Sequence, residues 1–198
     1  MSARHTVLRS LHDVGLAAWF GGSLMGAVGL NGAAKKQGAD WQQRARIASA
    51  GWSLWAPVGT VAIGAHLAGS GGLLCANATR VLTQQGLAAS TLAKTALTGA
   101  ALAATVYGRV LGKKIELASA GTPQDAEKAE RPPANTGQTE RHLSYVRWAV
   151  PALTCGLIVL NALHAEQQRP ANQLYGMLRR ARTLAPYMMS IHHWHRAH

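Results

Sequence analysis

At 198 residues the chain is long enough for one domain, and its charged residues, 14 % of the total, cluster so that four long apolar stretches stay nearly uncharged. A soluble all-α bundle would interrupt such stretches on every solvent-facing turn, so the pattern favours an integral membrane protein. The net charge of +12 does not indicate nucleic-acid binding, because the basic residues gather at the ends of these stretches and in the C-terminal tail, where the lipid bilayer and its anionic headgroups are the expected partner.

Four predicted transmembrane helices cover about residues 12–34, 51–74, 87–109 and 143–164. Each is long enough to cross the hydrocarbon core of a bilayer. A hydrophilic segment with most of the acidic residues separates the last two, and an even number of crossings puts both chain ends on one side. We therefore predict an all-α fold, an up-down four-helix membrane bundle over residues 1–165, followed by a basic, histidine-rich tail or interfacial helix over residues 166–198.

Small and aromatic residues in the first two spans predict how they pack. Gly22 and Gly26 have the GxxxG spacing that lets a second helix backbone approach closely, and Gly29 extends this row. In the second span Trp52 and Trp55 suit the headgroup boundary of a membrane. We therefore expect the first span to meet a neighbouring helix through its glycines.

Lysine and arginine predict the orientation. They are more frequent in the connection between spans one and two, and at both flanks of the connection between spans three and four, than around the opposite ends of the first three spans. Because cytoplasmic loops carry an excess of these residues, the count favours a multi-pass protein of the cell membrane with both termini on the extracytoplasmic side. The basic tail favours the opposite orientation.

Polar residues are expected at one common depth of the bundle, because spans one and three start where spans two and four end. They are His12, Asp13, His66, Lys94, Asn161 and His164. Ionisable groups inside a membrane usually face the bundle interior and are paired or functional. Each also has a structural explanation: groups at span ends can be hydrated, His66 can bond to a neighbouring carbonyl, and Lys94 can extend its stem to the interface.

Short motifs recur in order along three of the spans. They are Leu11-His12 with Trp19-Phe20-Gly21-Gly22, Leu92-Ala93-Lys94 with Tyr107-Gly108-Arg109, and Arg147 with Val150-Pro151-Ala152-Leu153. Together, over roughly residues 9–165, these motifs resemble the copper-resistance-protein-D-like superfamily, which includes the HemJ-type protoporphyrinogen oxidases.

The resemblance implies a four-helix membrane core in which His12 is an axial haem ligand and Lys94 lies near it. HemJ-type enzymes have Asn-Glu where this chain has Ala149-Val150, and a Tyr-His pair where it has Tyr107-Gly108. The resemblance therefore implies haem binding more directly than catalysis.

Three functions are compatible with these residues. The first is binding of haem b, with His12 and His66 as iron ligands and Lys94 paired with a propionate, with or without HemJ-type oxidoreductase activity. The second, which we favour, is a non-catalytic subunit of a membrane complex, or a homo-oligomer, that packs through glycine and alanine faces. The third is transport of copper or a small solute, although Met25 is the one methionine within the predicted spans.

Overall fold

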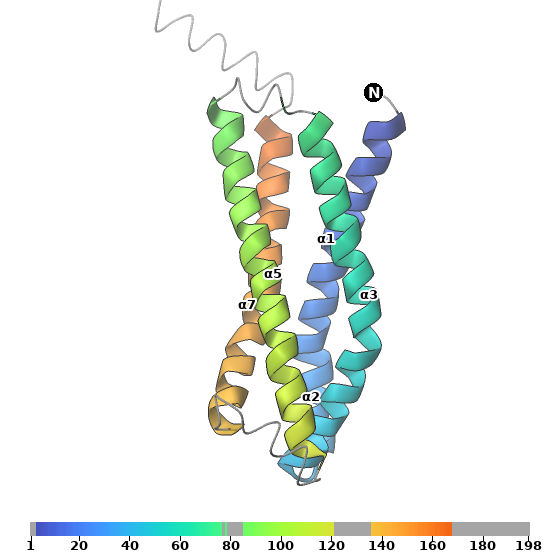
Figure 1. Cartoon of the computed structure of the whole chain (residues 1–198), viewed down its shortest axis with the longest axis vertical. Helices are drawn as coiled ribbons and strands as arrows, with labels where there is room; N and C mark the ends of the chain where they lie inside the picture. The colour runs from blue at the N-terminus through green and yellow to red at the C-terminus, as the bar shows by residue number, and fades with distance from the viewer. Residues whose placement is uncertain (1–2, 77, 79–84, 121–135, 168–198) are drawn as a thin grey trace, which may run out of the picture. The chain divides into compact units, whose positions relative to one another are not determined.

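The computed structural model describes residues 3–76, 78, 85–120 and 136–167. Apart from the turn at residues 38–40 and Ala120, these residues are helical, so the all-α prediction is confirmed. The elements are α1 (Ala3–Met25), the π-helical turn η1 (Gly26–Leu30), α2 (Asn31–Gln37), α3 (Trp41–Ala76), α5 (Gln85–Ser119) and α7 (Thr136–Gln167) (Figure 1). The predicted spans fall in order within α1 to α2, α3, α5 and α7.

The chain divides into two compact units, Met1–Ile158 and Val159–His198. The division lies inside α7, and the described part of the second unit is the end of that helix, residues 159–167. Asn161 and His164 belong to this second unit. Beyond Gln167, the predicted C-terminal tail lies outside the described residues.

Within the described residues, three segments are long and apolar enough to cross a membrane: His5–Gln37, Trp41–Ala76 and Gly137–Leu163. In their most apolar windows only 28 %, 22 % and 22 % of the residues are buried within the chain, so most apolar side chains face outward. Leu54 and Val61 of α3, for example, are 79 % and 73 % exposed. Exposed apolar faces of this size on long helices are those of a membrane bundle, in which lipid covers them.

Helix α5 is long enough to span a membrane, at 35 residues, but it is not among the three segments found in the described chain. Lys94 and several threonines lower the hydropathy of its first half. The crossing by α5, and with it the fourth span, stays a prediction.

The most extensive helix contact joins α1 and α3, and glycines make it close. A Cβ added to Gly15 would lie 2.5 Å from both the carbonyl oxygen of Ala62 and the backbone nitrogen of His66. A Cβ added to Gly69 would lie 2.5 Å from the backbone nitrogen of His12. The two backbones therefore touch at one reciprocal crossing, where any side chain would force them apart.

The predicted glycine row lies at the same interface but is used differently. Gly22 and Gly26 face the indole rings of Trp55 and Trp52, which occupy the space that a Cβ would need. These tryptophans are half-buried, and Trp52 donates a hydrogen bond of 3.4 Å from Nε1 to Oδ1 of Asn31. The GxxxG pair therefore packs against side chains of α3. The backbones of α1 and α3 come into contact two to three turns away, at Gly15.

A small core ties α1 to the other helices of the first unit. Buried side chains from α1, α5 and α7 form it: Leu16, Trp19, Ala101, Val150 and Leu157. Nε1 of Trp19 also donates to Oγ1 of Thr105 on α5, at 3.2 Å. This hydrogen bond satisfies the polar atom of a side chain that is only 3 % exposed.

Candidate functional site

A cluster of polar groups lies at the crossing of α1 and α3. Because Gly15 touches the backbone of His66 and Gly69 touches the backbone of His12, the two imidazoles are brought against each other. Their ring centroids are 4.5 Å apart and the planes are inclined by 43°. The structure thus brings together two residues that sequence analysis placed at the same depth.

His66 is held in one orientation by α1. Its Nδ1 lies 3.1 Å from the backbone oxygen of His12, and since a carbonyl can only accept, Nδ1 carries the proton of the neutral ring. The residue is 1 % exposed, and Nε2 is buried without a hydrogen-bond partner in the described part of the chain. The bond to a neighbouring carbonyl that the sequence allowed for His66 is therefore present, and it leaves a buried lone pair on Nε2.

His12 forms the more accessible half of the pair. Its Nδ1 is 2.8 Å from Oδ1 of Asp13, and the side chains are 15 % and 61 % exposed. A carboxylate acceptor fixes the proton on Nδ1 and directs the Nε2 lone pair away, as in many metal-binding histidines.

Lys94 approaches the same end from α5. It is half-buried and lies within electrostatic range of the Asp13 carboxylate. His12, His66 and Lys94 are therefore gathered near one carboxylate.

The geometry limits how a haem could bind here. Two opposite axial ligands must stand on either side of the porphyrin, each with a metal–nitrogen bond of about 2 Å. The imidazoles of His12 and His66 are in contact, and the glycine crossing behind them holds the two helix backbones together. The pair in this arrangement therefore does not fit as two opposite ligands of one iron. Among the described residues no group of three or more His, Cys, Asp or Glu side chains could hold a metal ion.

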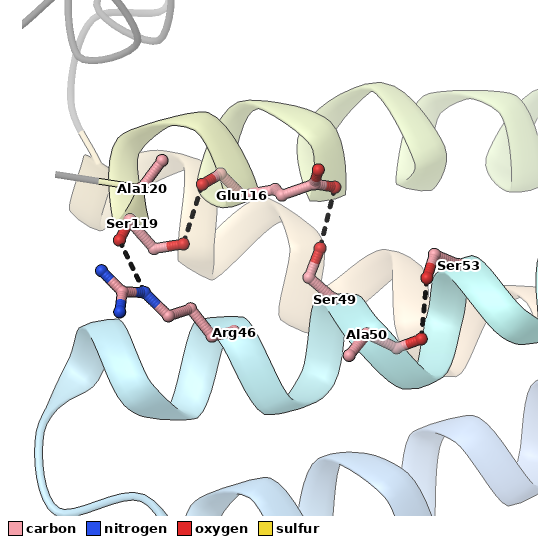
Figure 2. Close-up of a pocket in the computed structure, with 7 residues that line it drawn as sticks. All are labelled: Arg46, Ser49, Ala50, Ser53, Glu116, Ser119 and Ala120. Atoms are coloured by element: carbon pink, nitrogen blue, oxygen red, sulfur yellow. Dashed lines mark hydrogen bonds between the residues drawn. The ribbon is translucent and has the colours of Figure 1, made fainter. Parts of the chain in front are cut away.

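A second polar region, which sequence analysis missed, joins α3 to α5. Ser49 donates to Oε2 of Glu116 at 2.8 Å, and Nε of Arg46 donates to the backbone oxygen of Ser119 at 3.0 Å (Figure 2). Nζ of Lys113 lies 2.6 Å from Oε1 of Glu116. The hydrogen bonds from Lys113 and then Ser49 lower the pKa of Glu116, because both stabilise its charged form.

Further along the same contact, Arg109 reaches across from α5. Its guanidinium donates to the backbone oxygen of Ala56 at 3.0 Å and to Oγ1 of Thr60 at 3.1 Å and 3.2 Å. The only sequence signal was the spacing of Lys113 and Glu116, three residues apart on one helix face. Their partners on α3 depend on how the two helices are rotated.

No relative identifies the family. No protein-family model matches the chain, and neither the curated proteins nor the solved structures contain a match. The similarity of its motifs to the copper-resistance-protein-D-like superfamily therefore stays a prediction carried by those motifs alone.

Proposed function

We propose that the chain is a multi-pass protein of the cell membrane that acts as a non-catalytic subunit of a membrane complex, or of a homo-oligomer. The observation that supports this proposal is an unused row of small residues on the outer face of α3. Apart from the adjoining backbone of α3 itself and the neighbouring residues in the chain, no described atom lies within 4 Å of the position where a Cβ would stand on Gly64 or on Gly71. Ala68, between them and on the same helix face, is also exposed.

The inner face of α3 shows what such a row can do. There Gly69 allows α1 to come into backbone contact. In a membrane the lipid is as apolar as the helix, so close packing of small residues drives helix association. A glycine within a helix costs about 1 kcal/mol relative to alanine, and Gly64 and Gly71 gain no contact within the described chain in return. A helix of another subunit would use that surface.

The test is the mass of the assembly in mild detergent or nanodiscs, measured by native mass spectrometry together with the identity of copurified proteins. We expect Gly64→Leu and Gly71→Leu to release a folded monomer. Val14→Leu, at an outward position of α1 that already carries a branched side chain, is the matched control and should leave the assembly intact. An assembly of the same mass in the wild-type protein and in all three variants would contradict the proposal.

The second candidate is haem b binding, and the hydrogen bond between Asp13 and His12 favours it. In this proposal His12 would ligate the haem iron and Lys94 would pair with a propionate. Bound haem would supply one-electron chemistry of the kind that HemJ-type oxidoreductases use. With haem supplied during expression, a Soret band should be present, be lost in His12→Ala and persist in His66→Ala. Absence of the band from the wild-type protein would contradict this candidate.

The orientation proposed from the sequence is supported by where the basic side chains lie in the structure. Lys35, Lys36, Arg44 and Arg46 belong to the end of α2 and the start of α3, and Lys113 and Lys114 to the end of α5. An excess of these residues marks the cytoplasmic side, so the opposite end, with the start of α1, would be extracytoplasmic. Transport of copper or a small solute gains less support, because Met25 is 66 % exposed.

A further inference from the structure

The contact between α3 and α5 opens into a hollow of about 440 Å³. It is lined by Arg46, Ser49, Ala50, Ser53, Glu116, Ser119 and Ala120 (Figure 2). Two ionised groups line it, the guanidinium of Arg46 and the carboxylate of Glu116, and the ammonium of Lys113 pairs with that carboxylate from beside the hollow. Their formal charges leave one net positive charge at the hollow.

Both oxygens of the Glu116 carboxylate already take part in hydrogen bonds, whereas the guanidinium of Arg46 makes one through Nε alone within the described chain. Both oxygens of Glu116 accept hydrogen bonds, one from Lys113 and one from Ser49. Arg46 uses Nε to hold the end of α5, and Figure 2 shows its two terminal nitrogens directed away from the residues drawn there. Neither terminal nitrogen of Arg46 has a hydrogen-bond partner among the described residues, and two such donors present the geometry that binds a phosphate group through two parallel hydrogen bonds.

The hollow lies at the depth of lipid headgroups. With 36 residues α3 is about 54 Å long, well beyond the hydrocarbon core of roughly 30 Å, so its first turns project out of the core. Arg46 and Ser49 precede the tryptophan pair Trp52 and Trp55 by about one to two turns. Tryptophans concentrate at the membrane interface. The hollow therefore lies on the water side of the tryptophan pair, at the depth of the lipid headgroups.

Apolar tracks lead from the hollow toward the middle of the bundle on both helices. On α3 the face that begins with Ala50 continues through Leu54, Val58 and Val61, which are 79 %, 50 % and 73 % exposed. On α5 the face that begins with Lys113 continues through Val110 and Val106, which are 48 % and 61 % exposed. The molecule that matches this surface has an anionic head and long apolar chains.

We propose that this hollow and its rim bind one anionic phospholipid, with its phosphate on the terminal nitrogens of Arg46 at the rim and an acyl chain along the Leu54 and Val61 face of α3. The site does not depend on the proposed subunit role. An anionic lipid is a better match than a free phosphate ion, because its acyl chains contact the apolar tracks and the ion does not. Binding at this end would also hold α3 and α5 together and stabilise the proposed cytoplasmic orientation.

The test compares retention of phosphatidylglycerol with that of phosphatidylcholine of the same acyl chains, by native mass spectrometry of the protein released from detergent. We expect the wild-type protein to retain phosphatidylglycerol several-fold better. Arg46→Gln should abolish this preference. Lys36→Gln removes an exposed charge from the same end, but outside the hollow, and should keep it.

Arg46→Gln also removes the hydrogen bond that joins α3 to the end of α5, so a second variant, Glu116→Gln, tests the charge of the hollow separately. It removes the one negative charge of the hollow, so phosphatidylglycerol retention should be equal or higher. The proposal is overturned by equal retention of the two lipids, or by equal loss in Arg46→Gln and Lys36→Gln, which would show a response to net charge alone. Competition by soluble glycerol phosphate as strong as that by the lipid would instead identify a free phosphate site and would also overturn it.

Discussion

Gly69 of α3 packs directly on the backbone nitrogen of His12 of α1, with 2.5 Å between that nitrogen and the position of a missing Cβ. The same crossing sets Gly15 against the backbone of His66. Two glycines and two histidines thus form one unit: each glycine makes room for the helix that carries the opposite histidine. The contact between the imidazoles follows from this exchange and needs no ligand to hold it.

The first prediction concerns this crossing. Gly69→Ala places a methyl group against backbone that cannot move aside, so it should lower the free energy of unfolding by about 1–3 kcal/mol, the usual cost of overpacking. Gly21→Ala on α1 meets open space and should be neutral or stabilising by roughly 0.5–1 kcal/mol. Unfolding in mixed micelles would measure both, and similar values for the two variants would contradict the backbone contact.

The second prediction concerns the GxxxG pair. Gly26→Leu introduces a side chain where the ring of Trp52 lies, so the yield of folded protein in membranes should fall. Trp52→Ala removes that ring, and the double variant should recover part of the loss, since the two changes act on one space. If the double variant only added the two separate losses, the packing of Trp52 on Gly26 would be wrong.

The third prediction concerns α5 as a membrane span. If α5 crosses the membrane, reporters fused at the start of the chain and after His198 should lie on the same side, with a reporter near Gln124 on the other. If α5 does not cross, the two chain ends should give opposite signals. The pair of terminal fusions therefore distinguishes four spans from the three that length and hydropathy identify.

The fourth prediction concerns Lys94. Lys94→Met keeps the length of the side chain and removes a half-buried charge, so in the absence of a ligand the variant should be neutral or more stable. If the ammonium pairs with a propionate, the same variant should instead lose haem during purification. Thermal unfolding and the ratio of Soret to protein absorbance would be measured on one preparation. If Lys94→Met is less stable and the wild-type protein holds no haem, Lys94 is neither an unpaired half-buried charge nor the partner of a propionate, and both interpretations are wrong.

The fifth prediction concerns acid stability. The pKa of Glu116 is lowered in the folded protein by Lys113 and Ser49, so its contribution to stability is complete above the ordinary glutamate pKa and is lost as pH falls through the lowered value. The thermal midpoint of the wild-type protein should therefore fall more between pH 6 and 3 than that of Glu116→Gln. The effect should be small because Glu116 is 42 % exposed. Identical slopes would show that the carboxylate is not held as described.

The sequence by itself determined the helical class, the positions of the apolar helices and the depth of His12 and His66. Charge-free runs of about 20 residues must be helical in a membrane, because only a helix satisfies its own backbone there. Depth along a helix follows from residue counting at about 1.5 Å per residue, so two histidines on antiparallel neighbours can be matched without coordinates.

Only the tertiary structure decided which faces meet. Gly15 and Gly69 make the backbone contact, although Gly22 and Gly26 carry the more conspicuous spacing. The bonds from α3 to Glu116 and Arg109 have no counterpart in any local pattern. Residue counting fixes a position along the helix axis, but the rotation about that axis is chosen by the sum of contacts with every neighbour, here including the rings of Trp52 and Trp55.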